Sequence, residues 1–168
     1  MEYMTVPWRE DYIKNAHKMK ECFLCLASKT KNDKQNFILY RGKYNFIILN
    51  KYPYSPGHLM IAPYQHLDSI EKAEKKSSDE MVDILKKSIE ILRKAYHPHG
   101  FNTGMNIGHS AGAGVAHHYH MHVIPRWVGD SNFMPIIGKT KLTIEDLSKT
   151  YKNLYPSFKD LSLSYKNK

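Results

Sequence analysis

A short segment with three histidines at alternate positions constrains this chain more than any other feature. It reads His118-Tyr119-His120-Met121-His122-Val123-Ile124. Successive side chains of a strand point to opposite faces, so a strand here would place all three imidazoles on one face. Imidazole titrates near neutral pH, can attack an electrophile and can bind a metal. The pattern therefore favours a nucleophile with two supporting groups over a run of exposed or buried structural histidines.

Length and composition indicate one soluble domain. The chain has 168 residues, of which 42% are hydrophobic and 24% charged, and this is enough to form a substantial core. No apolar run reaches the length of a membrane-spanning helix. The segment Met1–Glu10 contains Glu2 and Arg9 and does not resemble a signal peptide. We expect a cytoplasmic protein with a single domain over 1–168, an N-terminal arm at 1–21 and a C-terminal extension from about 141 to 168.

The net charge of +9 allows two interpretations. It can reflect an anionic partner such as nucleic acid, a phosphorylated metabolite or a membrane surface. It can also reflect a proteome rich in lysine, because many lysines lie in mixed runs such as Glu71–Lys76. No basic stripe alternates with aromatic residues. We therefore expect neither a nucleic acid nor a membrane as partner, whereas a small phosphate-bearing substrate agrees with the charge.

The order of predicted elements indicates an α+β fold with a mainly antiparallel sheet. Short β-branched and aromatic runs predict five strands. These are Phe37–Tyr40, Tyr44–Leu49, His58–Ala62, Gly104–Gly108 and the histidine segment. Pro125 is expected to end the last of them. Ser77 and Glu80 form a capping box before a long helix, which ends near His97. The polar stretch Ser28–Gln35 predicts a loop.

A second, short helix is predicted over Thr143–Tyr155, and the tail from Ser157 onward is expected to be peripheral. Between the helices, the glycine-rich loop Ser110–Gly114 comes just before the histidine segment. Gly112 and Gly114 allow the backbone to approach a ligand and to turn N–H groups towards an anion. Glycines also form ordinary turns, but next to three histidines they suggest a phosphate held beside an imidazole nucleophile.

Several segments together resemble the histidine-triad (HIT) superfamily of nucleotide hydrolases and transferases. The triad with Val123 and Ile124 is similar to its signature, and Asn50–Pro63 and Gly104–Gly108 resemble two further family segments. Pro7-Trp8-Arg9, Cys22-x-x-Cys25 and Pro125–Phe133 look like the bacterial-type branch related to diadenosine tetraphosphate phosphorylase. The resemblance covers about residues 7–147. It implies a HIT-like fold with one long helix and a C-terminal helix.

The resemblance also implies a reaction. His120 would attack the α-phosphorus of a purine nucleotide and form a covalent nucleotidyl-histidine, His122 would bind phosphate oxygens or assist the leaving group, and His118 completes the triad. The leading reaction is phosphorolysis of diadenosine tetraphosphate, with inorganic phosphate as acceptor. Hydrolysis of a nucleoside phosphoramidate or polyphosphate is an alternative, as is a non-catalytic nucleotide-binding module. Family members commonly form homodimers through the long helix and the adjacent strand.

Further residues correspond to substrate-binding positions in the family. Asn50 would contact the ribose, although it can also cap a turn, and His58 would line the nucleotide site or be structural. Phe46 and Ile48 are candidates for the base pocket and equally for the core. Phosphate contacts are assigned to Asn106 and to four consecutive loop residues, Gly112, Ala113, Gly114 and Val115. Many relatives carry Gln and Ser or Thr where this chain has Gly114 and Val115, so Ser110 or backbone N–H groups would substitute.

Cys22 and Cys25 alone could be half of a metal site, a redox pair or two unrelated thiols. The resemblance to zinc-bearing members adds His66 and His118, which gives a closed site with four ligands and a structural zinc. Other histidines that could provide the fourth ligand are His17, His97, His99, His109 and His117. The last two could instead lie near the substrate or on the surface.

Overall fold

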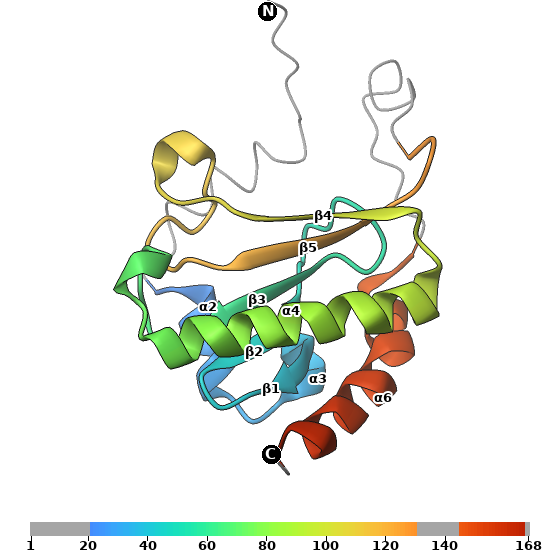
Figure 1. Cartoon of the computed structure of the whole chain (residues 1–168), viewed down its shortest axis with the longest axis horizontal. Helices are drawn as coiled ribbons and strands as arrows, with labels where there is room; N and C mark the ends of the chain where they lie inside the picture. The colour runs from blue at the N-terminus through green and yellow to red at the C-terminus, as the bar shows by residue number, and fades with distance from the viewer. Residues whose placement is uncertain (1–20, 131–144, 167–168) are drawn as a thin grey trace, which may run out of the picture.

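The computed structural model describes residues 21–130 and 145–166, with side chains up to Leu161 (Figure 1). Five strands form one antiparallel sheet in the order β1-β2-β3-β5-β4. Their bounds are β1 (Ile38–Arg41), β2 (Asn45–Leu49), β3 (Leu59–Pro63), β4 (Gly100–Met105) and β5 (Met121–Arg126). The predicted α+β fold with an antiparallel sheet is confirmed.

Helices cover both faces of this sheet. They are α2 (Phe23–Lys29), α3 (Asp33–Asn36), α4 (Lys75–Tyr96) and α6 (Leu147–Lys166), with 3-10 turns η1 (Ile70–Lys72) and η2 (His109–Ala111). The long helix α4 crosses one face, and α6 lies beside it against β1 (Figure 1). Within the described ranges, no helix combines the length and apolar character that a membrane crossing requires.

Alternation along β2 explains why two cores form. Ile47 and Leu49 point to the α4 face and pack with residues of α4 and α6. Phe46 and Ile48 point to the opposite face, where they pack with Leu24 of α2. All five side chains of β2 are buried, including that of Asn45. A strand with four consecutive buried apolar residues is typical of a sheet that is covered on both sides.

The predicted capping box is wrong, because α4 begins at Lys75 and both of its residues lie inside the helix. Glu80 is 7% exposed, and its carboxylate accepts hydrogen bonds from the backbone N–H groups of Lys43, Tyr44 and Asn45 at 2.7–2.8 Å. The Glu80 carboxylate therefore accepts from the free N–H groups of the turn between β1 and β2, and does not cap its own helix. The predicted end of the helix is confirmed, since His97 adopts φ 48° and terminates α4.

The C-terminal helix is longer than predicted. Thr143 lies outside the described residues, but Asp146 caps the helix, because its carboxylate accepts from the N–H of Ser148 at 3.1 Å. Helix α6 continues through Pro156 to Lys166. Phe158 and Leu161 are buried against the core, so the expectation of a peripheral tail is wrong. Their spacing continues that of Tyr151 and Leu154 along one helical face.

Three further boundaries differ from the sequence expectations. The predicted loop Ser28–Gln35 contains the end of α2 and most of α3. The predicted strand Gly104–Gly108 lies four residues earlier, at Gly100–Met105, where it pairs with β5. Pro125 does not end β5 but lies within it, opposite Phe101. Proline can occur in a strand where its missing N–H is not required by the hydrogen-bond ladder.

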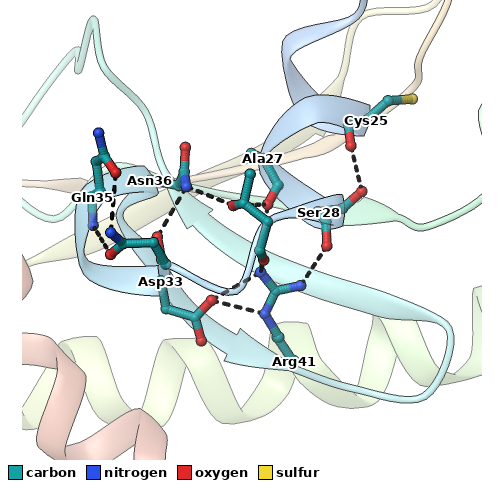
Figure 2. Close-up of polar contacts among 9 residues, drawn as sticks. Cys25, Ala27, Ser28, Asp33, Gln35, Asn36 and Arg41 are labelled. Carbon is teal, nitrogen blue, oxygen red and sulfur yellow. Dashed lines mark hydrogen bonds and ion pairs between the residues drawn. The ribbon is translucent and has the colours of Figure 1, made fainter.

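Arg41 at the end of β1 holds the α2–α3 segment in place (Figure 2). Its guanidinium donates to the carbonyl of Ser28 at 2.7 Å, to the carbonyl of Thr30 at 2.7 Å and to the carboxylate of Asp33 at 2.9 Å. Ser28 in turn donates to the carbonyl of Cys25 at 2.9 Å. These bonds fix α2, which contains Cys25 and directly follows Cys22, onto the edge of the sheet.

Candidate active site and metal centre

The three triad histidines lie on the α2 side of the sheet, as their alternation predicts. Tyr119 and Val123 are buried on the opposite side, in the core beneath α4. Only His122 belongs to a strand, because β5 begins at Met121. The segment before it is held by its own contacts, including a 2.7 Å bond from Tyr119 N–H to the carbonyl of Leu67. The prediction of a strand over the whole segment is therefore wrong, whereas the predicted facing is confirmed.

His120 has a hydrogen bond that defines its tautomer. Its Nδ1 lies 2.9 Å from the backbone carbonyl of His118. A carbonyl only accepts, so Nδ1 carries the proton and the neutral ring has its lone pair on Nε2. Burial lowers the pKa of His120, which favours the neutral form at pH 7. The ring is thus in the protonation state that nucleophilic attack through Nε2 requires.

A chain of hydrogen bonds determines the tautomer of His122, which is the opposite of that of His120. The backbone N–H of Tyr54 donates to His58 Nδ1 at 3.1 Å, so this nitrogen is unprotonated. Neutral His58 then carries its proton on Nε2, which lies 3.0 Å from His122 Nδ1. His122 accepts there, and its own proton must be on Nε2. Two neighbouring imidazoles, with ring centroids 4.7 Å apart, therefore present one lone pair and one N–H.

A cavity opens beside these two rings. Of the residues predicted to bind substrate or to react, seven line it: Asn50, Asn106, Gly112, Gly114, Val115, His120 and His122. His58 is buried behind His122 and acts on the cavity through it. Phe46 and Ile48 do not reach the cavity, because both point into the core beneath α2. Ala113 and Ser110 are also outside the lining.

Sequence reasoning did not identify four further lining residues, which are Phe23, Tyr52, Tyr54 and Met60. Met60 is opposite His122 in the pairing of β3 with β5, and so shares its face. Phe23 lies between the two cysteines. Tyr52 and Tyr54 flank Pro53 in the loop after β2. Aromatic residues in a turn between two candidate site residues were a readable signal for these tyrosines.

The glycine loop has a defined turn at its start. Gly112 adopts φ 77°, in the left-handed region that glycine tolerates, and its N–H donates to the carbonyl of His109 at 2.9 Å. This N–H therefore closes the turn and is not directed at a phosphate. His118 N–H contacts the carbonyl of Val115 at 3.3 Å. The loop is tied at both ends, and its middle residues border the cavity.

Four residues from three separate segments form a cluster that could hold a metal ion. One ligand atom from each of Cys22, Cys25, His66 and His118 lies within 4.8 Å of all the others. The sulfur of Cys22 is 3.3 Å from His118 Nδ1, and that of Cys25 is 3.2 Å from His66 Nδ1. Tetrahedral bonds of about 2.0–2.3 Å separate ligand atoms by roughly 3.3–3.8 Å. The two sulfur–nitrogen distances fit a tetrahedral ion.

The protonation of His118 also fits a metal ligand. Its Nε2 lies 2.9 Å from the carbonyl of Pro63 and must donate to it, which leaves the Nδ1 lone pair directed at the cysteines. Burial lowers the pKa of His118 to about 4. Burial also raises the pKa of Cys25, and the neighbouring Cys22 adds to the effect. A cation between the two sulfurs would reverse that penalty and favour the thiolates.

The other histidines lie away from this cluster. His97 terminates α4, and His99 accepts from the N–H of Val128 at 2.8 Å. His109 and His117 are exposed and contact one another with ring centroids 5.9 Å apart. Neither belongs to the cavity lining, so surface placement is confirmed for both. His17 lies outside the described residues.

Comparison with known proteins identifies the family. Residues 31–128 match the model of the HIT domain. The chain belongs to the HIT family. It is 42% identical over 119 residues to AP-4-A phosphorylase of Mycobacterium tuberculosis, a match that covers 71% of this chain and 61% of that protein. It is 25% identical over 117 residues to bis(5'-nucleosyl)-tetraphosphatase (asymmetrical) of Schizosaccharomyces pombe, covering 70% of this chain and 60% of that protein.

Solved structures show the same fold. A zinc-bound histidine triad family protein from Mycobacterium smegmatis superposes with a TM-score of 0.67 at 21% identity, covering 86% of this chain and 97% of that one. A histidine triad nucleotide-binding protein from Sulfolobus tokodaii gives a TM-score of 0.65 at 26% identity, covering 83% and 93%. These matches confirm the predicted HIT-like fold, with a long helix and a C-terminal helix.

Proposed function

We propose that this HIT-family chain is an enzyme that cleaves a dinucleoside polyphosphate through a covalent nucleotidyl-histidine at His120. The observation that carries the proposal is the pair of opposite tautomers at the cavity, a lone pair on His120 Nε2 and an N–H on His122 Nε2. A nucleophile and a hydrogen-bond donor side by side match the needs of a displacement at phosphorus.

In the first step, His120 Nε2 attacks the α-phosphorus of one nucleotide. The new N–P bond forms as the bond to the bridging oxygen breaks. That oxygen leaves as a charged terminal oxygen of ATP and accepts a hydrogen bond from His122 Nε2–H, which keeps its proton. Asn106, Gly114 and Val115 border the cavity, and the side-chain amide of Asn106 and the backbone N–H groups of Gly114 and Val115 would stabilise charge on the equatorial oxygens. The products are adenylylated His120 and, from diadenosine tetraphosphate, ATP.

In the second step, an acceptor displaces His120. An oxygen of inorganic phosphate attacks the phosphorus, the N–P bond breaks, and ADP leaves. The name of the Mycobacterium tuberculosis relative, a phosphorylase, supports phosphate as the acceptor. Water in its place would give AMP, and the name of the Schizosaccharomyces pombe relative, a tetraphosphatase, makes this the second candidate.

Incubation with diadenosine tetraphosphate, with and without phosphate, tests the proposal. We expect ATP and ADP in the presence of phosphate, detected by anion-exchange chromatography. AMP release that does not depend on phosphate would assign the chain to the hydrolases. His120→Ala should abolish both activities, whereas His117→Ala, which changes an exposed neighbour, should not. Turnover by His120→Ala would refute the covalent scheme.

Trapping the intermediate separates an enzyme from a binding module. A substrate with radiolabelled α-phosphorus should leave label on the wild-type chain after acid-free denaturation, and none on His120→Ala. Binding of AMP without any label on His120 would favour the non-catalytic alternative and contradict the proposed function.

We also propose that the metal of the Cys22, Cys25, His66 and His118 cluster is zinc. Two thiolates and two imidazoles are the ligand set that zinc prefers in closed structural sites, and the name of the Mycobacterium smegmatis protein supports it. When bound, the ion supplies a structural cross-link. With four protein ligands it leaves no open position for substrate, so every chemical role stays with the triad side of the cavity.

A further inference from the structure

Two half-exposed tyrosines form the outer rim of the cavity. Tyr52 is 54% exposed and Tyr54 is 50% exposed, and both belong to the lining. They lie in the loop that joins β2 to β3, between Asn50 and His58. Large aromatic side chains that remain exposed next to a cavity often mark a binding surface. Two of them on one short loop offer flat rings to a flat ligand.

The loop holds these rings in place before any ligand binds. The ring of Tyr54 stacks on the imidazole of His58 at 5.3 Å and 19°. Tyr52 N–H donates to the side-chain carbonyl of Asn50 at 2.9 Å. Ser55 donates to the carbonyl of Pro125 at 2.7 Å, which ties the loop to β5. Binding therefore costs little loop entropy, as expected of a preorganised site.

The end of the loop is also fixed by packing. Gly57 has φ 74°, and a Cβ at this position would lie 3.1–3.3 Å from the side chains of Leu92 and Tyr96 on α4. Glycine permits both the left-handed backbone and the close approach. The loop that carries Tyr52 and Tyr54 therefore packs against α4 at its end.

Tyr54 connects this rim to the leaving-group side of the proposed reaction. It stacks on His58, and His58 is bonded to His122 at 3.0 Å. In the proposed reaction His122 donates a hydrogen bond to the leaving oxygen, so the rest of the polyphosphate chain would extend past His122 towards Tyr54 and its loop neighbour Tyr52.

We propose that Tyr52 and Tyr54 form a stacking subsite for the second nucleoside of the substrate. This rests on the proposed function for the direction of the leaving group. Every nucleobase has a π-face, so stacking on tyrosine selects for the presence of a second base with little regard to its identity. The subsite would favour dinucleoside polyphosphates over ligands that carry one base on the same phosphate chain.

Binding to the inactive His120→Ala chain tests the subsite without turnover. Isothermal titration calorimetry compares diadenosine tetraphosphate with adenosine tetraphosphoribose, which has the same charge and phosphate number but lacks the second base. We expect the two-base ligand to bind about tenfold more tightly, the size of one base–aromatic stack. Adding Tyr52→Ala should bring the ratio of the two affinities close to one, and Tyr52→Phe should preserve it because the ring remains.

A second variant, Tyr54→Leu, keeps an apolar side chain but removes the ring, and should also lower the ratio. A ratio near one in the His120→Ala chain, a ratio unchanged by both tyrosine variants, or no binding of either ligand would overturn the proposal. These outcomes are distinct from failure of the proposed function, which would appear as absence of diadenosine tetraphosphate cleavage by the wild-type chain.

Discussion

At the scale of single residues, the direction of hydrogen bonds separates three chemically identical side chains. His120 donates from Nδ1 to a carbonyl, His118 donates from Nε2 to another carbonyl, and His122 accepts at Nδ1 from His58. The unprotonated nitrogen therefore faces the cavity in His120 and the cysteines in His118. In His122 the cavity side carries the proton. A supporting partner, and not the imidazole itself, determines each role.

His58 is the positioning residue whose removal should expose this dependence. His58→Phe keeps a ring beneath Tyr54 but removes the donor to His122, which can then present an unprotonated Nε2 to the leaving oxygen. We expect kcat for diadenosine tetraphosphate to fall about 10²-fold, within the range for loss of one hydrogen-bond donor to the developing charge. The measurement is steady-state kinetics of ATP release.

The matched control is a substrate that depends less on a hydrogen-bond donor, the p-nitrophenyl ester of AMP, because the negative charge of nitrophenolate is delocalised over its ring and nitro group. His58→Phe should change its turnover much less. An equal loss for both substrates would mean that His58 acts on the nucleophile or the fold and not on the leaving group.

Some positions of the site residues could be predicted from the sequence, and others could not. The alternating histidines define their own facing, because the side-chain period of an extended segment is two. Phe46 and Ile48 have the same apolar character as base-pocket residues, and only the position of α2 shows that they are covered. The position of Tyr52 and Tyr54 in a turn between two candidate site residues is a signal in the sequence, but only the path of the loop shows that both reach the cavity.

At the scale of elements, one carboxylate joins α4 to the sheet. Glu80 accepts from three consecutive backbone N–H groups and from the side chain of Asn45 at 2.8 Å. At Gly42 a Cβ would lie 2.9 Å from the Glu80 carboxylate. The turn between β1 and β2 is thus built around a side chain from a helix 35 residues away, and a capping box is the wrong interpretation of the same residue.

Glu80→Ala should destabilise the protein by about 3 kcal/mol, because it removes the acceptor of a buried N–H group of Asn45 and of two partly buried N–H groups in the turn. The free energy of unfolding from urea denaturation measures this. Glu90→Ala on the same helix is the control. Glu90 makes an exposed pair with Lys87, and its loss should cost less than about 1 kcal/mol. Similar values for the two variants would contradict the role of Glu80.

Element boundaries followed the sequence where a local signal dominates and departed from it where packing does. His97 ends α4 as predicted, since the sequence around Pro98 and Gly100 cannot continue a helix. Pro156 suggests an end to α6, but Phe158 and Leu161 gain burial on the core by continuing the helix. Packing of this kind depends on tertiary contacts that the local sequence does not contain.

The homodimer, the single domain and the cytoplasmic location stay predictions.

At the scale of the whole molecule, the metal cluster connects segments that are far apart in sequence. Cys22 and Cys25 belong to the α2 region, His66 follows β3, and His118 precedes β5. The backbone carbonyl of His118 also accepts the hydrogen bond of His120, the proposed nucleophile. Phe23, between the two cysteines, lies in the wall of the cavity. The proposed metal site and the proposed catalytic site therefore both use His118, but through different atoms.

This division predicts different outcomes for neighbouring histidines. His118→Ala removes a metal ligand and should reduce bound zinc from one per chain to well below one, measured by inductively coupled plasma mass spectrometry. Loss of the cross-link should cost about 4 kcal/mol, which lowers the Tm by roughly 8–16 °C for a chain of this size. His120→Ala should retain zinc and lose activity.

Chelation of the wild-type protein should reproduce the Tm loss of His118→Ala and should add nothing to that variant, because both remove the same cross-link. His117→Ala is the matched control, since this exposed neighbour lies outside the cluster and should leave both metal content and Tm unchanged. Full zinc content in His118→Ala would show that this ring is not a ligand. A zinc-free His120→Ala chain would instead show that the metal and the nucleophile cannot be separated, which the two hydrogen-bond directions at His118 and His120 argue against.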